Sequence, residues 1–330
     1  MSRWPVIPRT AQLVVGLLLS ACVQNDPPAT HQQPFSVCQG GILAALPLIA
    51  AEKGYFAAEG IAADISVLGD GKAAMGRFLN GDCDAAVVGE PPIVRQCFDR
   101  NDFAIIATVV SSDNATKILA LRSRGISSPR DLIGRRVGVS KGTTSHFFLD
   151  QFLKKNRIPT ETLTVVDISH QDMPEALQRG TIDAFAGSDV SYLKGLQAAG
   201  SDAVTFTECG LTTHAAGLVV GKKWLDANQG VARGVLRGLL RAERELAAHP
   251  EVALKPLAKR LETSPAELKA VMAEQHNIVT LDHIFLLSLE DQARWMQENG
   301  VAEGKPSINF LNFLDPTLLS ELKPGAVSLR

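Results

Sequence analysis

The sequence predicts an α/β protein of two lobes, each built from a mostly parallel sheet with helices on its faces. Short apolar runs suited to buried strands alternate with segments of helical periodicity. The order strand, helix, strand, helix, strand occurs before residue 122 and begins again at residue 137. The chain has 330 residues, of which 45% are hydrophobic, so it is long enough for two domains with cores of their own.

The first 34 residues are expected to be a leader and a tether. Two arginines precede a short apolar core at residues 11–19, which is too short to span a bilayer as a stable helix. The following Leu19-Ser20-Ala21-Cys22 resembles the bacterial lipobox, whose cysteine becomes the lipidated first residue of the mature chain. Residues 1–22 are thus predicted to be a lipoprotein signal peptide, and residues 23–34 a polar, proline-containing tether. This places the protein in the periplasm or on the outer face of the cell membrane, with a lipid anchor on Cys22.

The first lobe is expected to comprise residues 35–118 and 219–330. Its first strands are predicted at Phe35–Cys38, Ala63–Leu68, Ala85–Val88 and Ala104–Val110. The helices between them are predicted at Leu43–Lys53, at Gly71–Asn80 and from Ile93 onward. Because proline is favoured in the first turn of a helix, Pro91 and Pro92 predict a helix N-terminus directly after Gly89-Glu90.

The second lobe is expected to comprise residues 119–218. An apolar strand at Lys117–Arg122 leads into it, and a short helix follows at Ser127–Leu132. Its further elements are strands at Val137–Ser140, Leu163–Asp167 and Ile182–Ala186, and a helix at Met173–Arg179. After Val137–Ser140, Thr143 or Thr144 can cap a helix whose apolar face repeats through Phe148 and Phe152. Both lobes carry the pattern Gly-x-x-Asp-Ala at the start of a strand, at residues 81–85 and 180–184, which indicates an internal repeat.

The rest of the chain returns to the first lobe as a helical tail, which we interpret as scaffold. A return strand is predicted at Gly217–Val220. Helical segments are predicted at Lys223–Asn228, Val231–Ala248, Val252–Glu262, Pro265–Gln275 and Leu286–Asn299, and Asn309–Leu314 and Pro316–Leu322 close the chain. The chain thus crosses between the lobes twice, and two crossings make a hinge with a cleft.

Ligands of open parallel sheets bind beyond the carboxyl ends of the strands, so the turns at those ends are the candidate site. The candidate ligand-binding residues are Gly40, Gly41, Gly89, Glu90, Thr143, Thr144, Ser145, His146, Ser188 and Asp189. Residues 143–146 supply free backbone N–H groups, three hydroxyls and one imidazole at a helix start. Such a helix start favours an anion or another strong acceptor.

Several of these residues have a second interpretation. His146 can donate to a ligand, or it can be an ordinary polar histidine at a helix end. Glu90 repels an anion, so it would orient its turn, pair with a basic group or accept from a ligand N–H. Asp189 can face the cleft or cap its own helix. His170 and His214 are interpreted as structural.

A set of motifs in one order resembles the periplasmic solute-binding proteins of nitrate, sulfonate and taurine ABC transporters, and relatives that bind thiamin pyrimidine precursors. The motifs are Pro47–Phe56 (PLIAAEKGYF), Gly89–Pro92 (GEPP), Asp131–Val139 (DLIGRRVGV), Gly142–His146 (GTTSH) and Asp172–Leu177 (DMPEAL). The resemblance implies a type II periplasmic-binding-protein fold: two α/β lobes on a two-crossing hinge, with the helical tail on lobe one. It also implies a ligand held by Gly40 and Gly41, the Gly89-Glu90 turn and residues 143–146. Where the family often has an aromatic Trp-Glu-Pro turn, this chain has Gly187-Ser188-Asp189-Val190. The change removes a stacking wall and adds a carboxylate, which fits a zwitterion or a heterocycle with N–H donors.

The function expected from these features is that of a solute-binding lipoprotein of an ABC importer. It would bind a small nitrate-, sulfonate- or taurine-like solute or a small heterocycle, deliver it to a membrane permease and act as a monomer. The alternatives are a pyrimidine-precursor synthase-like enzyme on the same fold and a ligand-sensing partner of a membrane kinase. A net charge of −2 without a basic stripe argues against nucleic-acid binding.

The cysteines argue against metal binding and against the synthase alternative. Those synthases carry a cysteine-rich iron site, whereas Cys38, Cys83, Cys97 and Cys209 are widely spaced and form no Cys-x-x-Cys. We therefore expect no metal, no cofactor and no catalysis. The four cysteines are expected to be buried free thiols, although a Cys83–Cys97 disulfide is also open.

Overall fold

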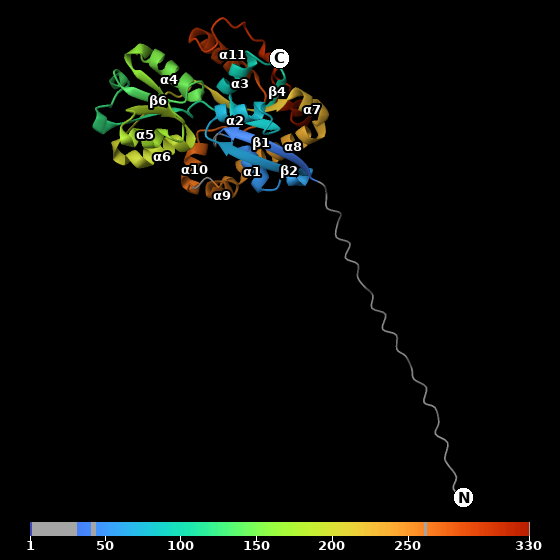
Figure 1. Ribbon diagram of the computed structural model, residues 1–330. Coiled ribbons are helices and arrows are strands. Elements are labelled where there is room, and N and C mark those ends of the chain that lie inside the picture. The colour runs from blue at the N-terminus through green and yellow to red at the C-terminus, as the bar shows by residue number, and fades with distance from the viewer. Residues whose placement is uncertain (2–31, 41–43, 261–262, 330) are drawn as a thin grey trace. The chain divides into compact units, whose positions relative to one another are not determined.

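A computed structural model describes residues 1, 32–40, 44–260 and 263–329 of the chain. The predicted signal peptide with Cys22, and Gly41 of the candidate site, lie outside the described residues. Residues 32–330 form one compact unit that contains two five-stranded sheets, as Figure 1 shows.

The first sheet has the strand order β2-β1-β3-β10-β4. Its strands are β1 (Gln33–Gly40), β2 (Ile61–Leu68), β3 (Ala85–Gly89), β4 (Phe103–Ser112) and β10 (His214–Gly221). β1 pairs in parallel with β2 and β3, whereas β10 runs antiparallel to both β3 and β4. The carboxyl ends of β1, β2 and β3 therefore lie at one edge of this sheet, as the sequence predicts.

Three helices connect the strands of this sheet: α1 (Ala45–Glu52), α2 (Gly71–Leu79) and α3 (Glu90–Cys97). Asp70 caps α2, because its Oδ1 accepts from the Ala73 backbone N–H at 2.8 Å. α3 begins at Glu90, three residues before the predicted start at Ile93, because prolines fit the first turn of a helix. The prediction of a helix N-terminus at the Gly89-Glu90 turn is thus correct, and only the extent of the helix was underestimated.

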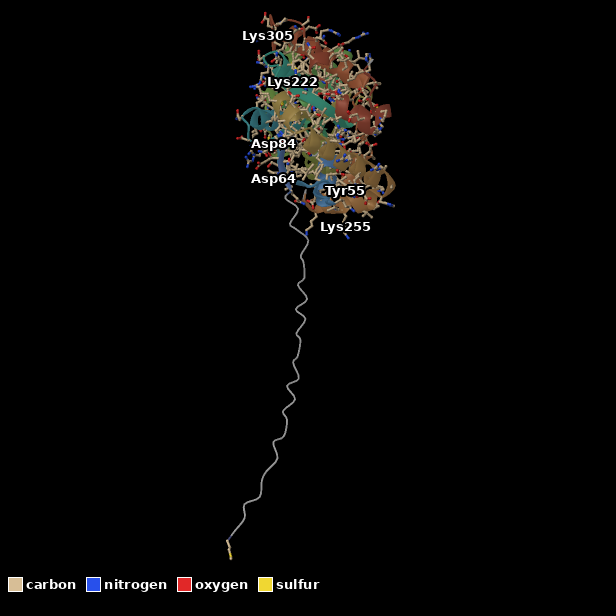
Figure 2. The ribbon with its side chains drawn as sticks, turned by 90° about the vertical axis from the view of Figure 1, so that its right-hand side faces the viewer. Tyr55, Asp64, Asp84, Lys222, Lys255 and Lys305 are labelled. Carbon is tan, nitrogen blue, oxygen red and sulfur yellow. A yellow bond between two sulfur atoms is a disulfide. The ribbon has the colours of Figure 1, made fainter. Side chains whose placement is uncertain are left out.

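The tail is helical, as predicted, and packs on the first sheet. Its helices are α7 (Lys222–Ala227), α8 (Gln229–Ala248), α9 (Pro250–Arg260), α10 (Pro265–Met272), α11 (His283–Glu298) and α12 (Thr317–Leu322). One large core joins β1, β3, β4 and β10 to α1, α8, α9 and α11. At its margin, the Arg241 guanidinium of α8 lies 4.5 Å from the ring centroid of Tyr55, which Figure 2 labels.

The second sheet has the strand order β7-β6-β8-β5-β9. Its strands are β5 (Lys117–Leu121), β6 (Arg136–Val139), β7 (Thr164–Asp167), β8 (Ala184–Gly187) and β9 (Ala203–Phe206). Its helices are α4 (Thr144–Lys155), α5 (Met173–Arg179) and α6 (Asp189–Ala199). One core lies under α4, around Phe148 and Phe152, and another lies under α5, around Met173 and Phe185.

The chain changes sheets twice. The first crossing runs from Ser112 to Lys117, and the second runs from Phe206 to His214. Near both crossings, the His214 ring Nε2 lies 2.9 Å from Thr212 Oγ1 and 3.4 Å from Thr116 Oγ1. Two α/β lobes joined by two crossings are the architecture that the sequence predicts, and the exact lobe boundaries stay predictions.

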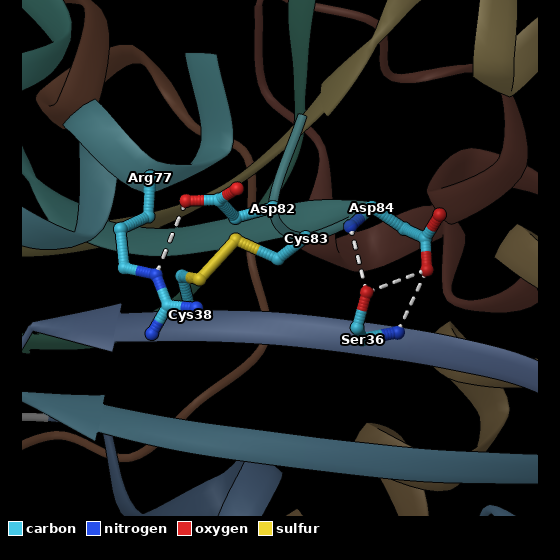
Figure 3. Close-up of a disulfide and its surroundings, with 6 residues drawn as sticks. All are labelled: Ser36, Cys38, Arg77, Asp82, Cys83 and Asp84. Atoms are coloured by element: carbon cyan, nitrogen blue, oxygen red, sulfur yellow. Dashed lines mark hydrogen bonds and ion pairs between the residues drawn. A yellow bond between two sulfur atoms is a disulfide. The ribbon is translucent and has the colours of Figure 1, made fainter. Parts of the chain in front are cut away.

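The cysteines correct one expectation. Cys38 in β1 and Cys83, two residues before β3, form a disulfide with a Cα–Cα distance of 6.0 Å (Figure 3). The expectation of free thiols was wrong for these two residues, because β1 and β3 are neighbours in the sheet and bring them together. Cys97 is free and buried, whereas Cys209 is free but exposed rather than buried.

Candidate functional site

The turns at the carboxyl ends of the two sheets meet one another. Ser140, directly after β6, donates from Oγ to Oδ2 of Asp70, which follows β2, at 3.1 Å. A Cβ placed on Gly89 would lie 3.3 Å from Cγ2 of Thr144, the first residue of α4. We call this meeting of the turns after β2 and β3 with the turn after β6 the junction. A side chain at position 89 would therefore press on the Thr144 methyl group, so Gly89 suits the close approach of the two sheets.

The start of α4 lies at the junction with its hydroxyls arranged around the turn. Thr143 Oγ1 donates to the Ser140 carbonyl at 2.7 Å and lies 3.1 Å from Ser145 Oγ. The Ser140 N–H in turn donates to Ser145 Oγ at 3.3 Å. Since the Thr143 side chain accepts no bond from the helix, the first backbone N–H groups of α4 keep their capacity for an external acceptor. The turn is therefore rigid and rich in donors.

Two histidines border this turn. The Gly142 N–H donates to Nδ1 of His146 at 3.3 Å. Nε2 of His170 lies 3.1 Å from Ser145 Oγ, and burial lowers the pKa of both imidazoles below the ordinary value. Coulombic interaction with Asp70 opposes the effect of burial on the pKa of His170. Burial thus favours the neutral form of both rings. In that form His146, whose Nδ1 accepts from Gly142, carries its proton on Nε2 and can donate from there, whereas the tautomer of His170 sets whether its Nδ1 donates or accepts.

Glu90 is fully buried behind the junction. Its Oε1 accepts from the Ala215 N–H of β10 at 2.7 Å and from Ser288 Oγ of α11 at 3.0 Å. Burial raises its pKa from 4.5 to about 7, while these hydrogen bonds act in the opposite direction. Its other oxygen, Oε2, has no partner among the described residues. Of the three roles considered for Glu90, these contacts favour the orientation of its own turn.

The remaining predicted residues stand apart from these contacts. Gly40 ends β1, where an added Cβ would lie 2.4 Å from the Gly71 Cα, so only glycine fits there. Ser188 precedes α6, and its carbonyl accepts from Ser191 Oγ at 2.7 Å. Asp189 begins α6, although its side chain is not described. Within the described residues, no hydrogen bond links Ser188 to the start of α4.

The structure adds residues that the sequence did not assign to the site. Asp70 and Ser140 meet across the junction, and His170 contacts the predicted residue Ser145 although we interpreted it as structural. Gln171 lies close by, since a Cβ on Gly69 would be 3.6 Å from its Oε1. The sequence signal for Asp70 and Ser140 was their place at the carboxyl end of a strand: Asp70 lies two residues after one predicted strand, and Ser140 ends another.

The described residues contain no group of three His, Cys, Asp or Glu side chains that could hold a metal ion. Among the helices described, none combines the length and apolarity that a membrane span requires.

The comparisons with known proteins agree with this architecture. No curated protein sequence matches the chain. The alkanesulfonate-binding protein SsuA from Xanthomonas axonopodis pv. citri, bound to MOPS, superposes with a TM-score of 0.75 at 17% identity, covering 86% of this chain and 98% of that one. The periplasmic aliphatic sulphonate-binding protein SsuA from Escherichia coli gives a TM-score of 0.70 at 16% identity, covering 85% and 97%. The periplasmic nitrate-binding protein NrtA from Synechocystis PCC 6803 gives 0.66 at 12% identity, covering 89% of each chain.

At these identities the likeness shows the fold, which is that of the periplasmic binding proteins. The fold predicted from the sequence is thereby confirmed. The family model described as NMT1/THI5 like matches residues 44–253, which is well over half of the chain. The protein therefore belongs to the NMT1/THI5-like family.

Proposed function

We propose that the protein is the solute-binding component of an ABC importer. The observation that carries this proposal is the junction, where the donor-rich start of α4 on one sheet faces Gly89 on the other. A solute held there would contact both lobes at once. A ligand with greater affinity for the closed arrangement shifts the population toward it, and a permease can recognise the closed form.

The proposed site comprises the predicted residues together with three from the structure. The predicted residues are Gly40, Gly41, Gly89, Glu90, Thr143, Thr144, Ser145, His146, Ser188 and Asp189, and the added ones are Asp70, Ser140 and His170. Their backbone N–H groups and hydroxyls can bind acceptor atoms of the solute. Asp70 and the His170 imidazole can accept from its N–H groups, while Nε2 of a neutral His146 can donate to one of its acceptors.

This chemistry supports a small polar solute that carries both acceptors and donors. A helix start near an anion contributes only about 0.3–1 kcal/mol, or up to ~2 when partly buried. A bare anion such as nitrate would also lie near the Asp70 carboxylate, which repels it. We therefore favour a zwitterion or a small N–H-bearing heterocycle over nitrate or a simple sulfonate.

We further propose that the chain is a monomeric lipoprotein whose residues 1–22 hold the signal peptide and the lipobox, with Cys22 as the first residue after cleavage. Cys22 would anchor it in the periplasm or on the outer face of the cell membrane, and residues 23–34 would be the tether. The lobes would comprise residues 35–118 with 219–330, and residues 119–218. The location agrees with the disulfide between Cys38 and Cys83, because disulfides persist in oxidising compartments.

The test is the identity of the small molecule that purifies with the protein. Native mass spectrometry of the purified chain should show one bound solute, and calorimetry should give binding in the micromolar range, which corresponds to roughly 8 kcal/mol. The solute should be recovered with its mass unchanged after long incubation. Chemical conversion would favour the enzyme alternative, and binding without uptake by cells would favour a sensing role. A protein that binds nothing from a periplasmic extract would contradict the proposal.

A further inference from the structure

One face of α11 carries polar and aromatic side chains into the protein interior. Ser288, Gln292 and Trp295 follow at spacings of four and three, so they lie on one side of the helix. Gln292 is fully buried, and Trp295 is 3% exposed. Fully buried glutamines are uncommon, so this face does more than fill space in a tail.

The first half of this face is fixed to the first sheet and to a crossing. Ser288 Oγ donates to Glu90 Oε1 at 3.0 Å and lies 3.3 Å from the Thr213 carbonyl on the second crossing. Gln292 Nε2 donates to Ser288 Oγ at 3.2 Å. Figure 1 shows α11 beside α3, the helix that Glu90 begins. α11 therefore moves with the first lobe.

The second half of the face contacts α4 of the second lobe. Trp295 Nε1 donates to Asp150 Oδ2 at 2.9 Å in a buried contact. Its ring meets His146 edge to face, with centroids 5.1 Å apart at 82°, and Phe147 at 5.4 Å and 70°. Phe147 belongs to the core of the first sheet, whereas its neighbour Phe148 belongs to the second. Residues 146–150 of α4 are thus held by a side chain of the other lobe.

We infer that Trp295 is a positioning residue for solute binding and forms an inter-lobe latch with Asp150. The indole N–H and the aromatic contacts hold the first two turns of α4 against the first lobe. This keeps residues 143–145 facing Gly89. The latch joins the lobes at a contact outside the two crossings, and it stabilises this arrangement even without solute. Its importance for solute affinity rests on the proposed function, whereas its effect on lobe closure does not.

The charge on Asp150 strengthens the latch. Asp150 is buried and also accepts an ion pair from the exposed Lys154 ammonium at 2.8 Å, one turn further along α4. A hydrogen bond to an ionised acceptor is stronger than one between neutral groups. Trp295→Phe would keep the aromatic packing and lose the N–H, which leaves the buried carboxylate with the Lys154 ammonium and the Gln151 side-chain amide, both on α4 itself.

Closure can be measured directly by the distance between two spin labels. Labels at Gln178→Cys on α5 and Lys255→Cys on α9 would report the separation of the lobes, since both positions are exposed and lie on different lobes. The full-length chain in detergent would carry Cys209→Ser, so that its exposed free thiol takes no label. The disulfide stays oxidised, no solute is added, and any co-purified solute is first removed by extensive dialysis and its absence checked by native mass spectrometry.

The parent should show mainly the short distance. Trp295→Phe should increase the population of longer distances about tenfold, as expected for the loss of a hydrogen bond to a charged group. Trp224→Phe is the matched control, because Trp224 packs on Phe35 within the first lobe, and it should leave the distance unchanged. Asp150→Asn keeps an acceptor for the indole N–H and should retain most of the closed population.

Other outcomes overturn the inference. If Trp295→Phe and Trp224→Phe give the same distances, Trp295 is a core residue without a latch role. A parent that is already open without solute contradicts the latch as well. If Trp295→Phe fails to fold, Asp150→Leu can replace it, because this variant removes the acceptor and leaves the indole in place. An unchanged distance between the labels in Asp150→Leu would also contradict the latch. None of these results depends on whether a solute is found, so they are separate from a failure of the proposed function.

Discussion

At the scale of single residues, Glu90 combines an acidic side chain with complete burial. Glu90 is the first residue of α3, but its carboxyl group is buried and accepts hydrogen bonds from the Ala215 N–H of β10 and the Ser288 hydroxyl of α11. An acid at a helix N-terminus is favourable only while it is charged, and burial opposes that charge. The balance leaves its pKa at about 7, so the protonation of this turn changes within the physiological range.

Glu90→Gln should therefore change how stability depends on pH. The folded pKa of about 7 lies above the ordinary 4.5, so the folded state holds a proton that the unfolded state releases as pH rises between these values. The parent loses stability over this window, and the variant does not. The free energy of unfolding of the variant relative to the parent should rise by roughly 3 kcal/mol between pH 4.5 and pH 8.

Urea denaturation of both proteins at several pH values measures this difference. His214, whose pKa burial lowers to about 4, loses its contribution to stability as pH falls from 6.5 toward 4. That effect is shared by both proteins and cancels in the difference. A difference in unfolding free energy that stays constant with pH would show that folding does not raise the pKa of Glu90.

Thr144→Asp should abolish solute binding without unfolding the protein. A fixed negative charge at the first residue of α4 would occupy the helix start that we propose binds acceptor atoms, and an acid in that position favours the helix itself. Calorimetry with the solute identified from purification measures the effect. Thr144→Ser keeps the hydroxyl and is the control. Undiminished binding by the aspartate variant would refute this site.

The helix start at residues 143–145 was predictable, because hydroxyls after a strand and glycine signal an N-terminus, and the structure begins α4 there. Its role in binding stays a proposal. Asp70 and Ser140 were not assigned to the site, although Asp70 lies two residues after a predicted strand and Ser140 ends one. Their contact joins two lobes, and no local pattern encodes a distance between segments 70 residues apart.

At the scale of elements, segments bounded by clear turn or cap residues were predictable even when they are short. α5 was found at its exact bounds because Pro174 fits the first turn and Gly180 adopts the left-handed end. β9 (Ala203–Phe206), whose residues are alternately buried and partly buried, was not predicted, although β6, β7 and β8 are equally short and were. α11 was interpreted as scaffold, because its sequence shows only helical periodicity. The role inferred for Trp295 depends on its contact with Asp150, which lies 145 residues away in the chain and leaves no mark in the local pattern.

The disulfide between β1 and β3 makes an element-scale prediction. It closes a loop with a sequence separation of 45 residues, which restricts the unfolded chain. Replacing both Cys38 and Cys83 by serine should lower the free energy of unfolding by about 2–4 kcal/mol. Urea denaturation under oxidising conditions measures the loss. Cys209→Ser should have the midpoint of the parent, and an equal midpoint for the double variant would mean that the bond does not form.

At the scale of the whole molecule, the repeated α/β lobes were predictable because the same order of elements occurs twice. The strand that returns to the first sheet was also expected, but its central place between β3 and β4 was not. Sequence order alone does not give the order of strands in space when a strand arrives after a long excursion.

The predicted anchor is testable on the full chain. Cys22→Ser should move the protein from the membrane fraction to the soluble periplasmic fraction, because it removes the residue that would carry the lipid. Immunoblots of separated fractions measure this change. The Cys209→Ser variant should stay with the membrane, and a parent that is already soluble would contradict the lipoprotein assignment.

The late position of β10 determines which of the two sheets can be completed first during synthesis. Every strand of the second sheet lies between Lys117 and Phe206, so that sheet has all its members once one continuous stretch has emerged. The first sheet lacks the strand that joins β3 to β4 until Gly221 has followed. As the chain is synthesised, β4 therefore has no neighbouring strand in its sheet until β10 has been made. The first sheet, which contains the earliest strands, is the later of the two to be completed.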